Sequence, residues 1–213
     1  MNFIPELSVL VPYVLGVIVI TITPGPDMTF FLARTISQGA AAGISAMSGA
    51  VLGTLIHSML VAFGLSALII ASPSLFLMIK ILGAGYLMWL AIDAIRNGST
   101  ISATDRPLKQ RSQHQIMAQG LVINLMNPKI ILFFMTFLPQ FVSPLDPYAP
   151  GKLLFLGFLF SVIAIPMILP MIFAAGRLTS FLKRSPKVTR LVDYIFATVF
   201  GAFAVRILLT ERG

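Results

Sequence analysis

The stretch that decides the fold is LSVLVPYVLGVIVITITPGPDMTFFLA, residues 7–33. It contains one charged side chain, Asp27, and exceeds the roughly 20 mostly apolar residues that a helix needs to cross about 30 Å of hydrocarbon. The motif Thr23-Pro24-Gly25-Pro26-Asp27 interrupts it, because proline removes a backbone donor and clashes with the preceding turn. The sequence therefore predicts a membrane-spanning helix that is broken next to an acid.

The composition of the whole chain places it in a membrane. Of its 213 residues, 57% are hydrophobic and 10% are charged, and the mean hydropathy is +0.95. A soluble domain is roughly 45–50% apolar even with glycine counted, and about 25% charged. These values exclude a soluble enzyme, a nucleic-acid-binding module and a disordered chain. Cysteine is absent, which excludes disulfides and thiolate metal sites.

Further apolar segments predict six transmembrane helices in all. Residues 1–10 hold Glu6 and no Lys or Arg, so the first run reads as a retained span and not as a signal peptide. A polar loop at 97–115 separates one three-helix half, 1–96, from another, 116–213. The fold class is thus an all-α integral membrane protein with one transmembrane domain, 1–213. After the first span, the predicted spans are 43–70, 74–95, 116–138, 151–175 and 191–209.

The basic residues predict the orientation. Six helices put both termini on one side of the membrane. Lys and Arg gather in cytoplasmic loops, so both termini are expected outside. This also accounts for the net charge of +8 without a nucleic-acid partner. Ten of the fifteen basic residues follow spans one, three and five: Arg34, Arg96, Arg106, Lys109, Arg111, Arg177, Lys183, Arg184, Lys187 and Arg190.

A second helix break repeats the first. The motif Asn124-Leu-Met-Asn127-Pro128-Lys129 interrupts the fourth span, which corresponds to the first span of the other half. With three spans per half, the second half is inverted relative to the first. Matched Gly or Pro interruptions in inverted repeats are the best sequence indication of a transporter binding site.

The two breaks predict a site for a zwitterion. Pro26 and Pro128 can each begin a half-helix, and the free amides at such N-termini attract a carboxylate. Asp27 can hold an ammonium group, while Lys129 either adds to the carboxylate side or pairs with Asp27. The predicted substrate-binding residues are Pro24, Gly25, Pro26, Asp27, Asn124, Asn127, Pro128 and Lys129.

Three more polar residues are candidates for coupling or for supporting contacts. His57 lies on a small-residue face and is either a helix-contact histidine or a proton relay. Lys80 either reaches the interface or faces the interior, and Tyr86 is deep enough to reach a cavity. The Gly39/Gly43 and Ser45/Gly49/Gly53 spacings predict close helix packing. No metal or cofactor is expected, because no ligand cluster or phosphate-binding loop is present.

These motifs, in their order, resemble the LysE/RhtB family of amino-acid exporters of bacterial inner membranes. The resemblance covers essentially the whole chain and implies export of small amino acids driven by an ion gradient, with the proton as the expected ion. Ala91 departs from the family, which commonly has Gly there. The matching elements are 23–27, 39–53, 80–87, Gly120, Asn124, 127–129 and 139–141.

The substrate and its alternatives stay open at this point. A cationic substrate calls for a second buried acid, which the spans do not offer, so a neutral amino acid of the homoserine, threonine or leucine type is favoured over lysine or arginine. In the expected mechanism Asp27 holds the ammonium or carries the exchanged proton. An exporter of metal or other inorganic cations, a membrane-embedded enzyme and an assembly partner are the alternatives, and a homo-oligomer is compatible with all of them.

Overall fold

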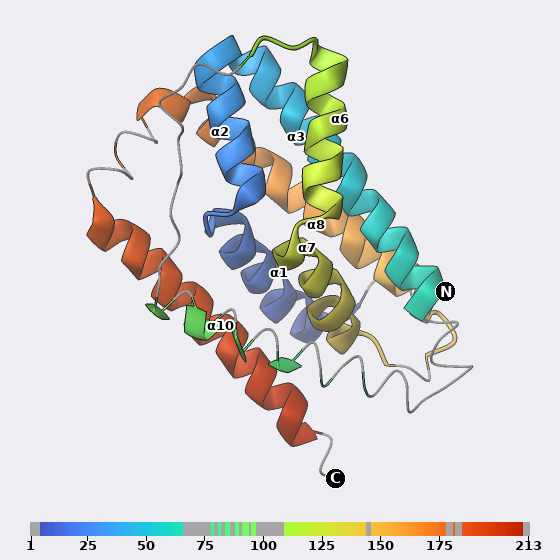
Figure 1. The fold of residues 1–213 in the computed structure, drawn as a ribbon. Helices are drawn as coiled ribbons and strands as arrows, with labels where there is room; N and C mark the ends of the chain where they lie inside the picture. The colour runs from blue at the N-terminus through green and yellow to red at the C-terminus, as the bar shows by residue number, and fades with distance from the viewer. Residues whose placement is uncertain are drawn as a thin grey trace.

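The computed structural model describes residues 5–65, 109–143, 146–177, 181 and 185–210, with single helical positions between 78 and 96. All regular structure in these residues is helical (Figure 1). Lys80, Tyr86 and most of the predicted third span lie outside the described residues. The helices are α1 (Leu7–Ile22), α2 (Pro26–Gln38), α3 (Ala40–Met59), α6 (Gln113–Leu125), α7 (Pro128–Leu132), α8 (Ala149–Phe173) and α10 (Pro186–Thr210).

Both predicted helix breaks are confirmed. Helices α1 and α2 meet at a 49° bend, and α6 meets the segment Pro128–Phe141 at a 52° bend. Pro26 and Pro128 occupy the first turn of the helix that follows each bend. Beyond α7 the chain continues through a π-helical segment, Phe133–Phe137, and a 3₁₀ turn, Leu138–Phe141.

The chain is a multi-pass membrane protein. Ala40–Gly64 and Ala149–Phe173 are long and apolar enough to span a bilayer, with mean hydropathies of 1.7 and 2.5, and each bent pair passes as one further span. Helix α10 covers the predicted sixth span, 191–209, but is not among the described helices that meet this length and composition criterion. It carries four charged residues, Lys187, Arg190, Asp193 and Arg206. Large apolar side chains such as Leu15, Phe158 and Phe173 point outward, as lipid contact requires.

Small residues bring α3 and α6 together, as their spacing predicted. A Cβ atom on Gly49 would lie under 3.0 Å from backbone atoms of Met117 and Leu121, and one on Gly120 would clash with the carbonyl of Ala46. The two backbones can approach this closely only because neither position has a side chain. This contact holds the first half of the chain against the second broken helix.

An aromatic cluster anchors the segment after the second break. Phe133 and Phe137 are fully buried and stack on each other at 4.8 Å. Tyr13 of α1 and Phe200 of α10 contact both rings, and the Tyr13 hydroxyl donates to the Leu156 carbonyl of α8 at 2.6 Å. The cluster therefore joins α1, α8 and α10 around the π-helical segment.

Arg34 was expected in a loop, and the structure places it inside α2. The helix continues to Gln38, and the Arg34 side chain is buried. Its guanidinium donates to the Lys109 carbonyl at 3.1 Å and to Gln119 at 2.9 Å. Gly39, with a φ of 86°, then turns the chain into α3, a conformation that glycine adopts without strain.

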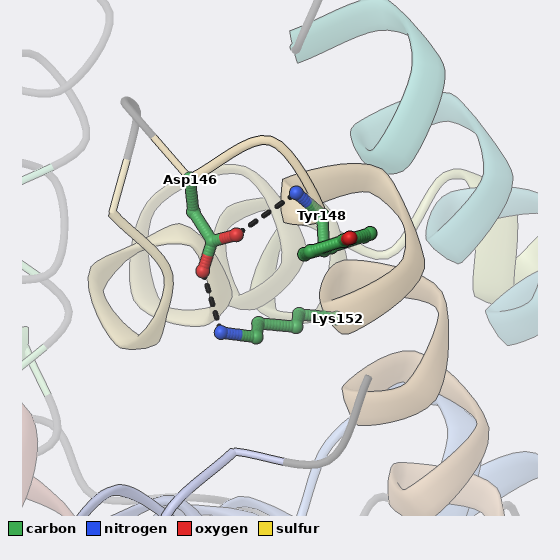
Figure 2. Close-up of polar contacts among 3 residues, drawn as sticks. All are labelled: Asp146, Tyr148 and Lys152. Carbon is green, nitrogen blue, oxygen red and sulfur yellow. Dashed lines mark hydrogen bonds and ion pairs between the residues drawn. The ribbon is translucent and has the colours of Figure 1, made fainter. Parts of the chain in front are cut away.

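Asp146, Tyr148 and Lys152 form a small polar cluster at the start of α8 (Figure 2). One carboxylate oxygen of Asp146 accepts a hydrogen bond from the backbone amide of Tyr148 at 2.8 Å, and the other pairs with the Lys152 ammonium. These hydrogen bonds, the one from Lys152 first, hold the pKa of Asp146 below its usual value. The cluster fixes where the fifth predicted span starts.

Candidate functional site

The helix breaks border an internal cavity of about 60 Å³. Helices α1, α2, α3, α6, α7 and α8 all contribute to its wall. The polar lining residues are Thr21, Thr23, Asp27, Thr54, Asn124, Lys129 and Ser161, and the apolar ones include Met28, Phe31, Met47, Phe160, Ile168 and Met171.

Asp27 lies in the first turn of α2 and has one oxygen in use. Its Oδ2 accepts a hydrogen bond of 2.9 Å from the Asn124 amide nitrogen. Its Oδ1 is buried and has no hydrogen-bond partner among the described residues, and the same is true of Asn124 Oδ1. A buried acceptor without a donor is costly, so Asp27 Oδ1 favours a ligand that carries N–H donors. Asn124 Oδ1 instead lies against α3, where a Cβ on Gly53 would be 2.5 Å from it.

The Lys129 side chain caps the C-terminal end of α1. Its ammonium donates to the carbonyl oxygens of Ile20 and Thr23, at 3.1 and 2.8 Å. A cation is favourable there because the last carbonyls of a helix have no partners and carry the negative end of its dipole. Gly25 allows this approach, since a Cβ on it would lie 3.0 Å from Lys129 Nζ. Two of the three ammonium donors are thus in use.

The two half-helix N-termini differ, contrary to the expectation that both present free amides. Asn127 caps α7: its Oδ1 accepts from the Lys129 amide at 3.0 Å, and its carbonyl accepts from the Ile130 amide. Pro128 has no amide, so the first turn of α7 has none to offer. Gly25 gives α2 no side-chain cap, which leaves the amides of Asp27 and Met28 without an intrahelical acceptor.

His57 supports the second break and is absent from the cavity lining. Its Nε2 lies 3.5 Å from the Asn124 carbonyl, and its ring stacks on Phe134 with centroids 5.7 Å apart. Gly53, one turn earlier on α3, faces the Asn124 side chain, which a Cβ there would displace. Helix α3 thus packs against Asn124, the α6 residue that donates to Asp27. Pro24, Pro26 and Pro128 shape the backbone of the breaks and do not line the cavity.

Several lining residues were not predicted as site residues. Thr54 and Ser161 supply hydroxyls from α3 and α8, and aliphatic side chains together with three methionines and two phenylalanines form the apolar wall. No local motif marks them, because their position depends on how distant helices pack. Across the described part of the chain, no three His, Cys, Asp or Glu residues are grouped as a metal ion would require.

The sequence is similar to a described protein family and to several membrane proteins. Residues 18–211 match the family described as LysE type translocator. An uncharacterised membrane protein of Pseudomonas aeruginosa is 32% identical over 199 residues, covering 92% of both chains. Proteins named leucine efflux protein, from an Enterobacter species and from Klebsiella pneumoniae, are each 30% identical, again over 92% of both chains. No solved structure matches.

Proposed function

The chain belongs to the family of LysE type translocators, and from this premise we propose that it exports a small neutral amino acid in exchange for protons. The export runs across the bacterial inner membrane, with the basic loops in the cytoplasm and both termini outside. The six predicted helices form two inverted three-helix halves, and the binding site lies between the broken helices. The observation that carries the proposal is the unpartnered Asp27 oxygen beside Asn124 in a cavity at the helix breaks.

The polar end of the cavity complements an α-amino acid. The ammonium group donates to Asp27 Oδ1, a buried acceptor that has no partner among the described residues. The carboxylate lies against the third donor of Lys129 and the uncapped amides at the start of α2. Both groups of the zwitterion are therefore matched by opposite charge within one site.

The rest of the wall fits an aliphatic side chain. Met28, Met47 and Met171 are flexible and can repack around ligands of different shape. A cationic substrate side chain would have no second acid here. Relatives named leucine efflux protein support a leucine-like substrate.

The test uses purified protein in proteoliposomes. Vesicles preloaded with unlabelled amino acids are placed in labelled L-leucine, and counterflow is measured for a panel that includes L-threonine, L-homoserine and L-lysine. We expect uptake of label with neutral amino acids inside and little with lysine. A transmembrane pH gradient should then drive net leucine movement. The absence of counterflow for every amino acid would refute the proposal.

The same vesicles distinguish the remaining alternatives. An exporter of inorganic cations would move divalent metal ions, detected with an entrapped fluorescent indicator, and no amino acid. A membrane-embedded enzyme or an assembly partner would move neither. In proton exchange, Asp27 either binds the ammonium or carries the proton, and substitution of this residue separates the two roles.

A further inference from the structure

We propose that Ser161 of α8 is a substrate-binding residue whose hydroxyl donates a hydrogen bond to the carboxylate of the transported amino acid. This inference rests on the proposed function and deepens it by adding a contact from a helix that carries no predicted site residue. Ser161 is 5% exposed, it lines the cavity, and its Oγ has no partner within the described residues.

The lack of a partner separates Ser161 from the other buried helical hydroxyls in the described part of the chain. A Ser or Thr in a helix can donate to the carbonyl oxygen four residues earlier, which satisfies the hydroxyl without any ligand. Ser161 does not form this bond. The described residues that do form it are Thr21, Thr23, Thr35, Ser48, Thr54, Ser58, Thr136 and Thr198.

The contrast holds within the cavity itself. Thr21, Thr23 and Thr54 also line it, and their hydroxyls donate to backbone carbonyls at 2.7, 2.7 and 3.1 Å. The Ser161 hydroxyl is buried on the same wall and unused. Burying a hydroxyl without a partner is unfavourable, and a ligand in the cavity is what can supply that partner.

The chemistry of the remaining groups selects the carboxylate. Asp27 Oδ1 is an acceptor and matches the ammonium end of an amino acid. The carboxylate end needs donors, and Lys129 has already given two of its three to the end of α1. A free hydroxyl supplies one more donor without adding charge to the site.

The experiment compares Ser161→Ala with Ser58→Ala in leucine counterflow. Both variants remove one buried helical hydroxyl, but Ser58 lies outside the cavity lining and its hydroxyl donates to the Thr54 carbonyl at 2.8 Å. We expect Ser161→Ala to raise the KM for L-leucine about tenfold, as loss of a hydrogen bond to a charged group does, with Ser58→Ala near wild type. Ser161→Thr, which keeps a hydroxyl, should restore most of the affinity.

A second probe tests which end of the substrate Ser161 contacts. 3-Methylbutylamine has the ammonium and side chain of leucine without the carboxylate. Its inhibition of leucine counterflow should be equal in wild type and Ser161→Ala. Should the alanine variant not reach the membrane, Ser161→Cys, a weaker donor of similar size, is expected to give an intermediate KM.

The inference is overturned by an unchanged leucine KM in Ser161→Ala, by an equal rise in Ser58→Ala, or by an equal loss of inhibition by the amine. Each result assumes that the wild type transports leucine. If the wild type moves no amino acid, the proposed function itself fails, and the two failures are therefore distinguishable.

Discussion

Replacing Asp27 by Asn tests the site at its central residue. Asn124 donates to Asp27 Oδ2, so an Asn at position 27 must turn its remaining oxygen toward Asn124 to keep that bond. Its NH₂ group then occupies the place of Oδ1, the acceptor that is buried and unpartnered. The substitution thus removes the acceptor for the ammonium and presents a donor to it.

The magnitude follows from the bond that is lost. A hydrogen bond between charged groups contributes about 1.5–3 kcal/mol. Since 1.4 kcal/mol is a factor of ten, we expect kcat/KM for leucine export to fall roughly 10- to 100-fold. Asp146→Asn is the control, because Asp146 lies in the loop before α8, away from the cavity, and its substitution should leave export unchanged.

The assay separates the two roles of Asp27. Leucine counterflow needs binding but no proton gradient, whereas net export driven by a pH gradient needs both. Loss of both in Asp27→Asn identifies the ammonium contact, while retained counterflow with lost pH dependence identifies the proton carrier. Wild-type values for both measurements would refute the reasoning, because Asp27 would then be an acid without a transport function.

Three further predictions concern the stability of the fold. Lys129→Met should lower the unfolding temperature in detergent, since each α1 carbonyl left unpartnered costs about 1–3 kcal/mol; an unchanged temperature would contradict the capping role. Gly49→Ala should destabilise by about 1–3 kcal/mol through overpacking against α6, whereas Gly64→Ala, with open space around it, should not. The lowered pKa of Asp146 means that its pairing with Lys152 stabilises the fold above the unfolded pKa near 3.8 and that this contribution is lost as the pH falls through the folded value. The difference in unfolding temperature between wild type and Asp146→Asn should therefore be present at pH 6 and shrink as the pH falls below 3.8.

The helix breaks could be predicted because their causes are local. Pro26 and Pro128 lack an amide wherever they occur, and Gly25 and Asn127 precede them in the sequence. The start of α6 also has a local signal: Ser112 and Gln115 form a capping box, so the helix begins at Gln113 and not at the predicted 116. That pattern was available in the sequence.

Other features depend on residues far apart in the chain. The burial of Arg34 requires partners at Lys109 and Gln119, and the position of Lys129 requires the end of α1. No local spacing of a lysine beside a helix break distinguishes a ligand contact from a helix cap. Ser161 could not be predicted for the same reason, since only the packing of α8 against the other helices brings it to the cavity.

Residues of the second helix break form hydrogen bonds to residues of the first. The ammonium and the carboxylate of a substrate therefore affect these hydrogen bonds differently. Lys129, at the second break, caps the carbonyl end of α1, and Asn124, at the same break, supports the acid at the start of α2. An ammonium group can bind Asp27 Oδ1 without displacing either contact, because that oxygen is unused. A carboxylate that approaches Lys129 instead competes with the carbonyls of Ile20 and Thr23 for the same ammonium. We therefore expect the ammonium to anchor the substrate in a preformed position and the carboxylate to be the group that loosens the contact between the two broken helices.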